Sequence, residues 1–99
     1  MTEHEPEGCD GEATVEVEGE QPRPARTALA ARFDPLAGHV VWTGRVSVAL
    51  PPGTELVVRT PAGSGAARAV EQDPWGNTRI RGTGRPPFPV ELLDAVDPP

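Results

Sequence analysis

The sequence predicts an all-β domain, a small antiparallel meander of about six strands that closes into a barrel or a sandwich. Apolar residues recur at every second position from Gly11 onward, which is the period of a half-buried strand. Turn-forming clusters interrupt this pattern at intervals of about ten residues, and the 99 residues include 13 prolines and 11 glycines. We therefore expect a single β-domain over residues 11–90, a disordered acidic tail over residues 1–10, and a short helix or frayed tail over residues 91–99.

The first two predicted strands lie on either side of a proline-rich break, QPRP. In ATVEVEGE, Ala13 and Val15 alternate with polar residues and define an inward face. In ARTALAARF, Leu29 and Phe33 alternate with Ala and Arg, although alanine and leucine also favour helix. The flanking prolines and the turn-like DPLAGH that follows favour a strand over a helix.

HVVWTGRVSVAL, residues 39–50, carries the strongest alternating pattern and is the best-defined strand of the set. It places Trp42 on the inward face and His39 and Arg45 on the outward face. Because the neighbours of Trp42 at two-residue spacing are apolar, we expect this ring in the core. Gly44 interrupts the inward face, and a glycine inside a strand often marks a bend or a close approach by another group.

The C-terminal half contains three shorter predicted strands, in ELVVRT, AARAVEQ and TRIRG, separated by turns at PAGSG and DPWGN. Asp73 begins the second turn before a proline, where its side chain can accept an N–H from two residues later. The same turn holds Trp75. Ile80 is predicted to be the inward anchor of the last strand.

Composition and charge exclude several classes of protein. The net charge is −6, but eight of the fifteen acids lie in residues 1–20, while residues 21–99 hold seven acids against nine arginines. No basic stripe suits duplex nucleic acid, and no apolar run reaches membrane-spanning length. Cys9 is the only cysteine, and no Cys/His spacing resembles a zinc site. The opening MTEHEPEGCD is unlike a signal peptide, so we expect a cytoplasmic protein that binds no metal or cofactor.

Residues for catalysis are few. The histidines are His4, in the acidic tail, and His39. A Ser–His–acid set would need His39 and Ser47, which lie on one strand face but beyond hydrogen-bond reach. Body carboxylates such as Glu55 and Glu71 are better explained as cross-strand partners of arginines.

Five residues are candidates for binding a ligand or a partner: Arg85, Trp75, His39, Arg45 and Phe88. A large ring in a turn, such as Trp75, either covers an open barrel end or projects towards a ligand. A guanidinium placed before two prolines, such as Arg85, suits anion or carbonyl recognition or a buried ion pair. A strand of about six residues is about 20 Å long, so the loops holding Trp75 and Arg85 begin at opposite ends of the barrel. These two residues share a site only if the chain end folds back.

Four segments, GHVVWTGRV, RTPAG, DPWGN and RIRGTGRPPFPV, resemble in that order an uncharacterised actinobacterial domain family. The resemblance covers about Gly11 to Val90. By position, the family pattern falls on Gly38, Trp42, Gly44, Arg45, Asp73, Trp75, Gly76, Gly82, Gly84, Arg85, Pro87 and Phe88. Such domains occur as short stand-alone proteins and fused to the C-terminal side of flavin-dependent monooxygenases of the Baeyer–Villiger type. The resemblance therefore implies an associate, the flavin monooxygenase, and no activity of the domain itself.

Three functional hypotheses follow. The first is a non-catalytic β-barrel binding module that docks on a flavin-dependent monooxygenase or carries its small organic substrate. The second is a small isomerase or cyclase of actinobacterial secondary metabolism, which needs a pocket lined by Trp42 or Trp75 and holding His39, Arg45 or Glu71. The third is a purely structural domain or one that forms homo-oligomers.

Overall fold

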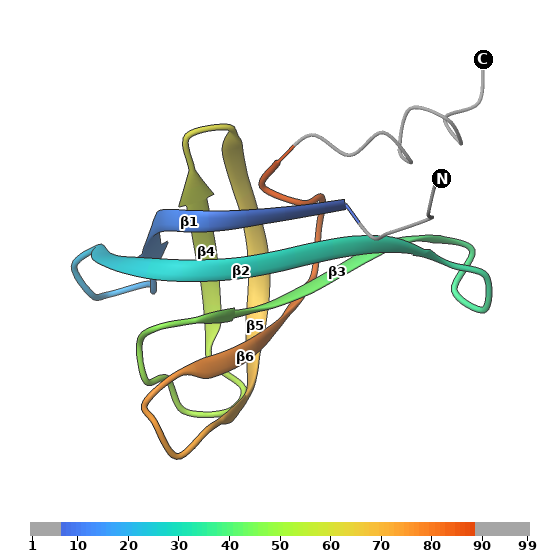
Figure 1. Ribbon diagram of the computed structural model, residues 1–99. Helices are drawn as coiled ribbons and strands as arrows, with labels where there is room; N and C mark the ends of the chain where they lie inside the picture. Colours follow the sequence, from blue (N-terminus) through green and yellow to red (C-terminus); the bar gives the residue numbers. More distant parts are fainter. Residues whose placement is uncertain (1–6, 89–99) are drawn as a thin grey trace.

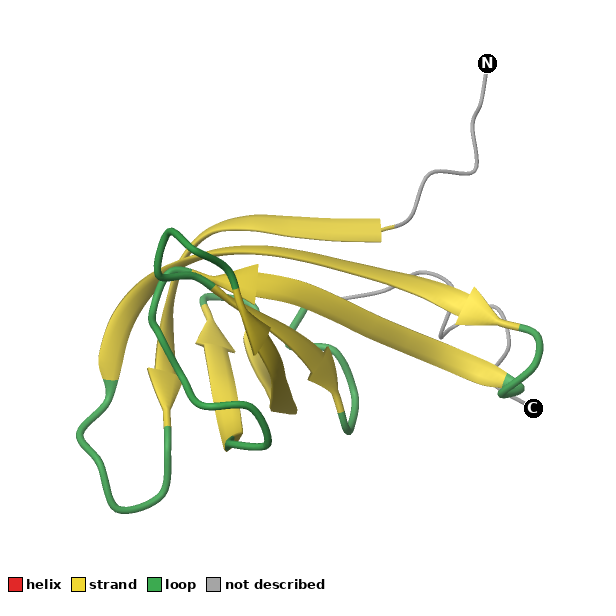
Figure 2. Cartoon of the chain, turned by 90° about the horizontal axis from the view of Figure 1, so that it is seen from below, coloured by secondary structure: helices red, strands yellow, loops and turns green. Residues whose placement is uncertain are grey.

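In the computed structural model, which describes residues 7–88, the chain forms six antiparallel strands that close into a barrel (Figure 1). The strands are β1 (Glu7–Glu16), β2 (Arg23–Asp34), β3 (His39–Val46), β4 (Glu55–Thr60), β5 (Gly63–Gln72) and β6 (Thr78–Gly82). The described residues contain no helix (Figure 2), so ARTALAARF is a strand, as its flanking prolines predicted. The predicted all-β class, the count of six strands and the closure into a barrel are confirmed.

The strand order around the barrel is β1-β2-β3-β6-β5-β4, and β4 returns to pair with β1. The prediction of one continuous meander therefore needs a correction, because the sheet consists of two three-strand meanders, β1–β3 and β4–β6. The connection between them, residues 47–54, crosses from β3 to the far side of the barrel, and β3 pairs with β6 instead of β4. The seam between β1 and β4 is short: it pairs residues 14–16 of β1 with residues 57–59 of β4, and residues 7–13 of β1 extend beyond it.

β3 ends at Val46, whereas the alternating pattern predicted a strand to residue 50. The chain leaves the sheet there and Leu50 turns inward, 2% exposed. The Leu50 N–H donates to the Thr78 hydroxyl at 2.9 Å, and the Gln72 side-chain amide donates to the Leu50 carbonyl at 2.9 Å. The apolar residues at the end of HVVWTGRVSVAL thus close one end of the barrel.

β1 begins at Glu7, inside the segment that was predicted to be a disordered tail. Residues 7–10 pair in register with residues 31 to 28 of β2, and Cys9 packs against the core. Their apolar periodicity is weak because pairing with the long β2 strand, and not an apolar face, holds them in place. β5 likewise begins at Gly63, so the PAGSG turn is shorter than predicted. The remaining predictions for residues 1–6 and 91–99 concern positions outside the described residues.

The core is built mainly from small and branched side chains around Trp42, its largest side chain, which is 1% exposed. This confirms the inward assignment of Trp42. Its indole N–H donates to the Gly84 carbonyl at 2.9 Å. A methyl group at Gly82 would overlap the indole ring, and one at Gly44 would overlap the Leu29 side chain. Both glycines are therefore places of close approach, as predicted for Gly44.

Candidate functional site

The turn between β5 and β6, DPWGN, is organised by the Asp73 carboxylate. Its Oδ1 accepts the N–H of Trp75 at 2.9 Å and of Asn77 at 3.0 Å, and its Oδ2 accepts the Asn77 side-chain amide at 3.1 Å. The hydrogen bond from the Asn77 N–H, reinforced by the other donors, lowers the pKa of Asp73 below its usual value, although partial burial opposes the shift. The predicted N–H acceptor role of Asp73 is thus present, and the turn has a defined geometry.

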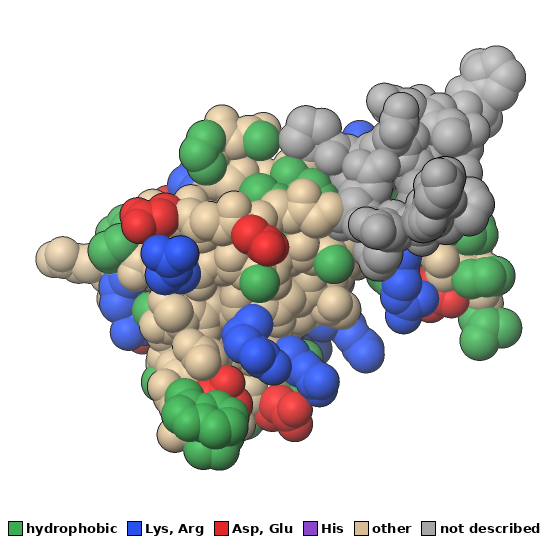
Figure 3. Space-filling view, in the orientation of Figure 1, with side chains coloured by type: hydrophobic (Ala, Val, Ile, Leu, Met, Phe, Trp, Pro, Cys, Tyr) green, Lys and Arg blue, Asp and Glu red, His purple; other side chains and the backbone are tan. Residues whose placement is uncertain are grey.

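Trp75 projects from this turn with 81% of its surface exposed. Gly76, which follows it, has a φ of 88°, a left-handed conformation that suits glycine. The ring does not cover the barrel end, because most of its surface is open to solvent. Figure 3 shows apolar side-chain atoms protruding over the β5–β6 turn, beside arginine side chains. The large apolar ring of Trp75 is thus exposed to solvent on a turn of defined geometry.

Arg45 lies next to the same turn, on the outward face of β3. Its Nε is 3.9 Å from the Asp73 Oδ2, and its side chain is 60% exposed. Asp73 therefore links two of the predicted binding residues, Trp75 through a backbone hydrogen bond and Arg45 through a long ion pair. At such exposure the ion pair orients Arg45 more than it stabilises the fold.

The loop after β6 has a mainly structural role. Pro87 and Phe88 are buried, and the Thr60 hydroxyl donates to the Pro87 carbonyl at 2.6 Å. A methyl group at Gly65 would lie 2.6 Å from the Arg85 carbonyl oxygen, so this glycine makes room for the loop. Phe88, predicted as a binding candidate, is a member of the hydrophobic core.

Arg85 and His39 both lie beyond the other end of β6. They line a hollow of about 390 Å³ between the start of β3 and residues 82–86. Both side chains are exposed, and the His39 Nδ1 lies 3.1 Å from the Val40 carbonyl. In the part of the chain that the structure describes, Arg85 has no ion-pair partner, so the buried ion pair considered for it is not formed there.

The structure thus divides the five predicted residues among three places. Trp75 and Arg45 share the Asp73 turn, His39 and Arg85 share the hollow beyond the far end of β6, and Phe88 is in the core. Trp75 and Arg85 do not come together, in keeping with the strand geometry. Sequence reasoning did not single out Arg79 and Arg81, which join Arg45 on the outer face. The alternation in TRIRG was the signal that could have identified them.

Residues 7–88 offer neither a metal-binding cluster nor a membrane-spanning helix. No group of three His, Cys, Asp or Glu side chains lies close enough together there to hold a metal ion. Those residues also include no helix of the length and apolar character needed to cross a membrane.

Comparison with known proteins connects the chain to a family and to longer proteins. A domain of unknown function, DUF4873, matches residues 6–90. Uncharacterised proteins from Mycobacterium bovis and from two strains of Mycobacterium tuberculosis, CDC 1551 and H37Rv, are each 37% identical over 84 residues, covering 80% of this chain and 24% of the relative. The chain therefore spans about a quarter of the length of the curated relatives it matches. No solved structure matches it significantly.

Proposed function

Since the chain belongs to the DUF4873 family of domains of unknown function, we propose its function from its exposed residues: it is a non-catalytic binding module. It docks on a larger protein through the Asp73 turn, with Trp75 as the anchor and Arg45 beside it. The predicted associate, a flavin-dependent monooxygenase, is the partner that we propose.

The observation that supports this proposal is the 81% exposure of Trp75 on a turn held by five hydrogen bonds to or from Asp73. Tryptophan and arginine are the side chains most enriched among the residues that dominate binding energy at protein interfaces. A ring on a preorganised turn loses little conformational freedom when a partner covers it. Exposing the ring in the free protein has no benefit for folding, whereas burying it against a partner would be favourable.

The lengths of the relatives support a role beside a larger protein. The matched region makes up 24% of each mycobacterial relative, so in those chains a similar domain is attached to a much longer polypeptide. This relationship supports a role of the domain beside a larger protein. The flavin monooxygenase is proposed because of the resemblance of GHVVWTGRV, DPWGN and RIRGTGRPPFPV to domains fused to such enzymes.

The alternative of an isomerase or cyclase gains less support. That function needs a pocket lined by Trp42 or Trp75. Trp42 is 1% exposed, and neither tryptophan lines the hollow near Arg85 or the hollow near Arg81. The binding module is therefore the function that the geometry favours.

The test is the affinity of the purified chain for the purified flavin-dependent monooxygenase encoded nearest to its gene, measured by isothermal titration calorimetry. Trp75→Ala should weaken binding by about thirtyfold or more, the effect of losing an interface residue worth about 2 kcal/mol. Leu36→Ala is the matched control, because Leu36 is 98% exposed in the turn between β2 and β3.

Equal weakening by the two variants would point to non-specific apolar contact, and unchanged affinity in Trp75→Ala would remove the Asp73 turn from the interface. Absence of binding by the unaltered chain would refute the proposed partner. Thermal melts of each variant establish that the barrel is intact.

A further inference from the structure

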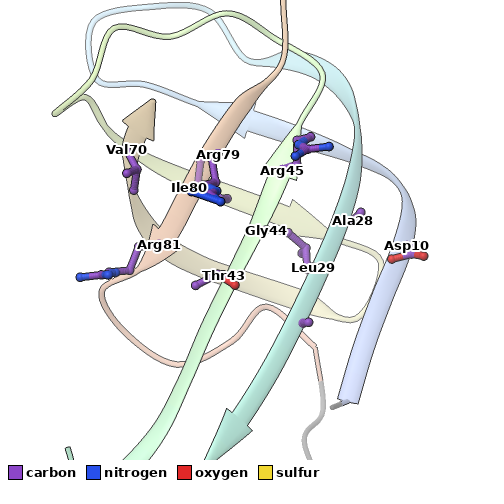
Figure 4. Close-up of a pocket in the computed structure, with 11 residues that line it drawn as sticks. Asp10, Ala28, Leu29, Thr43, Gly44, Arg45, Val70, Arg79, Ile80 and Arg81 are labelled. Atoms are coloured by element: carbon purple, nitrogen blue, oxygen red, sulfur yellow. The ribbon is translucent and has the colours of Figure 1, made fainter. Parts of the chain in front are cut away.

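The outer face of the barrel has a hollow of about 550 Å³ over β2, β3 and β6. Its floor consists of the short side chains of Ala28, Ala30 and Thr43. Figure 4 shows Arg45, Arg79 and Arg81 on one side of this floor, on β3 and β6, and Asp10 across it on β1. The volume lies within the range of roughly 300–1,000 Å³ that small-molecule sites occupy.

The floor is unusual for a strand surface. Ala28 and Ala30 face outward on β2, where they are exposed, and Thr43 lies opposite Ala30 on β3. Alanine is depleted in strands, and exposed strand positions are more commonly filled by larger side chains that cover their neighbours. Two alanines in alternation leave a flat, apolar surface that is open to a ligand.

The three arginines beside the floor form a wall that is unusual in its charge. Arg45 and Arg79 are direct partners across β3 and β6, and Arg81 lies two residues beyond Arg79 on the same face. Like charges directly opposite each other destabilise a sheet. This arrangement therefore favours the barrel less than mixed charges would, and it is better explained by an anion bound between the guanidinium groups.

Acidic neighbours compensate this charge only in part. Glu71 contacts Arg79 at 3.1 Å, and Asp73 lies 3.9 Å from Arg45. Within residues 7–88 Arg81 has no ion-pair partner; its cross-strand neighbours are Thr43 and Arg68, and the latter is paired with Glu55. Arg81 is thus the cation of the wall with the most capacity for a new partner.

We propose that this hollow binds a small organic acid whose flat apolar body lies on Ala28, Ala30 and Thr43. The carboxylate of the acid accepts hydrogen bonds from Arg81, and Arg45 and Arg79 add to the positive potential. The planar fork of a guanidinium matches the two oxygens of a carboxylate. The hollow shares Arg45 with the proposed docking surface but is not lined by Trp75, so the Arg81→Gln and Trp75→Ala variants test the two proposals separately.

The test uses 2-naphthoate as the probe and the neutral 2-naphthamide as its uncharged counterpart, each titrated into the full chain and followed by ¹H–¹⁵N NMR. We expect saturable binding of naphthoate, with shifts centred on residues 28–30 and 43–45, and at least tenfold weaker binding of the amide. Arg81→Gln should weaken naphthoate binding at least tenfold, and Ala30→Leu, which fills the floor without changing charge, should do the same.

Matched controls separate this site from general effects. Arg59→Gln removes an arginine on β4 that pairs with Glu16, and Ala66→Leu enlarges an exposed alanine on β5. Both variants, like Trp75→Ala, should bind naphthoate as the unaltered chain does.

Several results would overturn the proposal. They are no saturable binding up to about 10 mM, equal binding of the neutral amide, unchanged binding by Arg81→Gln, or loss of binding in Trp75→Ala. Inorganic phosphate that displaces naphthoate at equal concentration would also overturn it, because the hollow would then recognise charge alone and not an organic acid.

Discussion

Gly82 and Trp42 provide the sharpest test of how this small barrel is packed. A Cβ atom at residue 82 would lie closer than 3.0 Å to three atoms of the Trp42 ring, a distance that real Cβ atoms essentially never show. The ring is 1% exposed and hydrogen-bonded to the Gly84 carbonyl, so it cannot swing aside as a surface side chain would. Overpacking a core typically costs about 1–3 kcal/mol, and a fixed ring places Gly82→Ala at about 3 kcal/mol.

The assay is urea unfolding followed by tryptophan fluorescence, with Gly84→Ala as the control. Nothing lies within 4 Å of the Cβ position at residue 84, and its φ is not positive. Gly84→Ala should therefore change the free energy of unfolding by no more than about 0.5 kcal/mol. If Gly82→Ala unfolds at the same urea concentration as Gly84→Ala, the close contact between Gly82 and Trp42 does not exist.

Three further predictions concern other parts of the barrel. Asp73→Ala should lower the melting temperature at pH 7. Because the folded pKa of Asp73 lies below its unfolded value, its contribution to stability is fully present above about pH 4 and is lost as the pH falls from there towards the folded pKa. A difference in melting temperature from the unaltered chain that stays constant down to pH 3 would contradict this. In urea unfolding, Phe88→Ala should destabilise the barrel by about 3–5 kcal/mol, whereas Arg85→Gln should change the free energy of unfolding by about 0.5 kcal/mol or less. The reverse order of these two effects would mean that Phe88 lies on the surface. Deleting residues 1–10 should lower the melting temperature because residues 7–10 pair with β2; an unchanged melt would support the disordered tail that the sequence suggested.

Most of the architecture could be predicted from the sequence, because a strand that is buried on one face has apolar residues at every second position. This period identified all six strands, the inward position of Trp42 and the anchoring role of Ile80, which is fully buried. Asp73 was also predictable, since an Asp before Pro in a Gly-containing turn has few other uses. These features depend on neighbours within a few residues of each other.

The features that the sequence did not reveal depend on residues far apart in the chain. The pairing of β3 with β6 is decided by where residues 47–54 cross the barrel, and periodicity carries no information about partners. The burial of Phe88 follows from space that Gly65 leaves for the loop. The hollow beside Arg81 combines two alanines of β2 with arginines of β3 and β6, and only the strand order brings them together.

Trp75 is proposed to anchor the domain to its partner, whereas Trp42 stabilises the fold. The two tryptophans give two indole N–H signals in a ¹H–¹⁵N NMR spectrum, one from an 81% exposed ring and one from a ring bonded to Gly84. On titration with the flavin-dependent monooxygenase, the Trp75 indole signal should shift or broaden first, and the Trp42 signal should keep its position apart from the broadening common to the whole complex. An unperturbed Trp75 signal in a complex that forms by an independent assay, such as sedimentation, would contradict the claim.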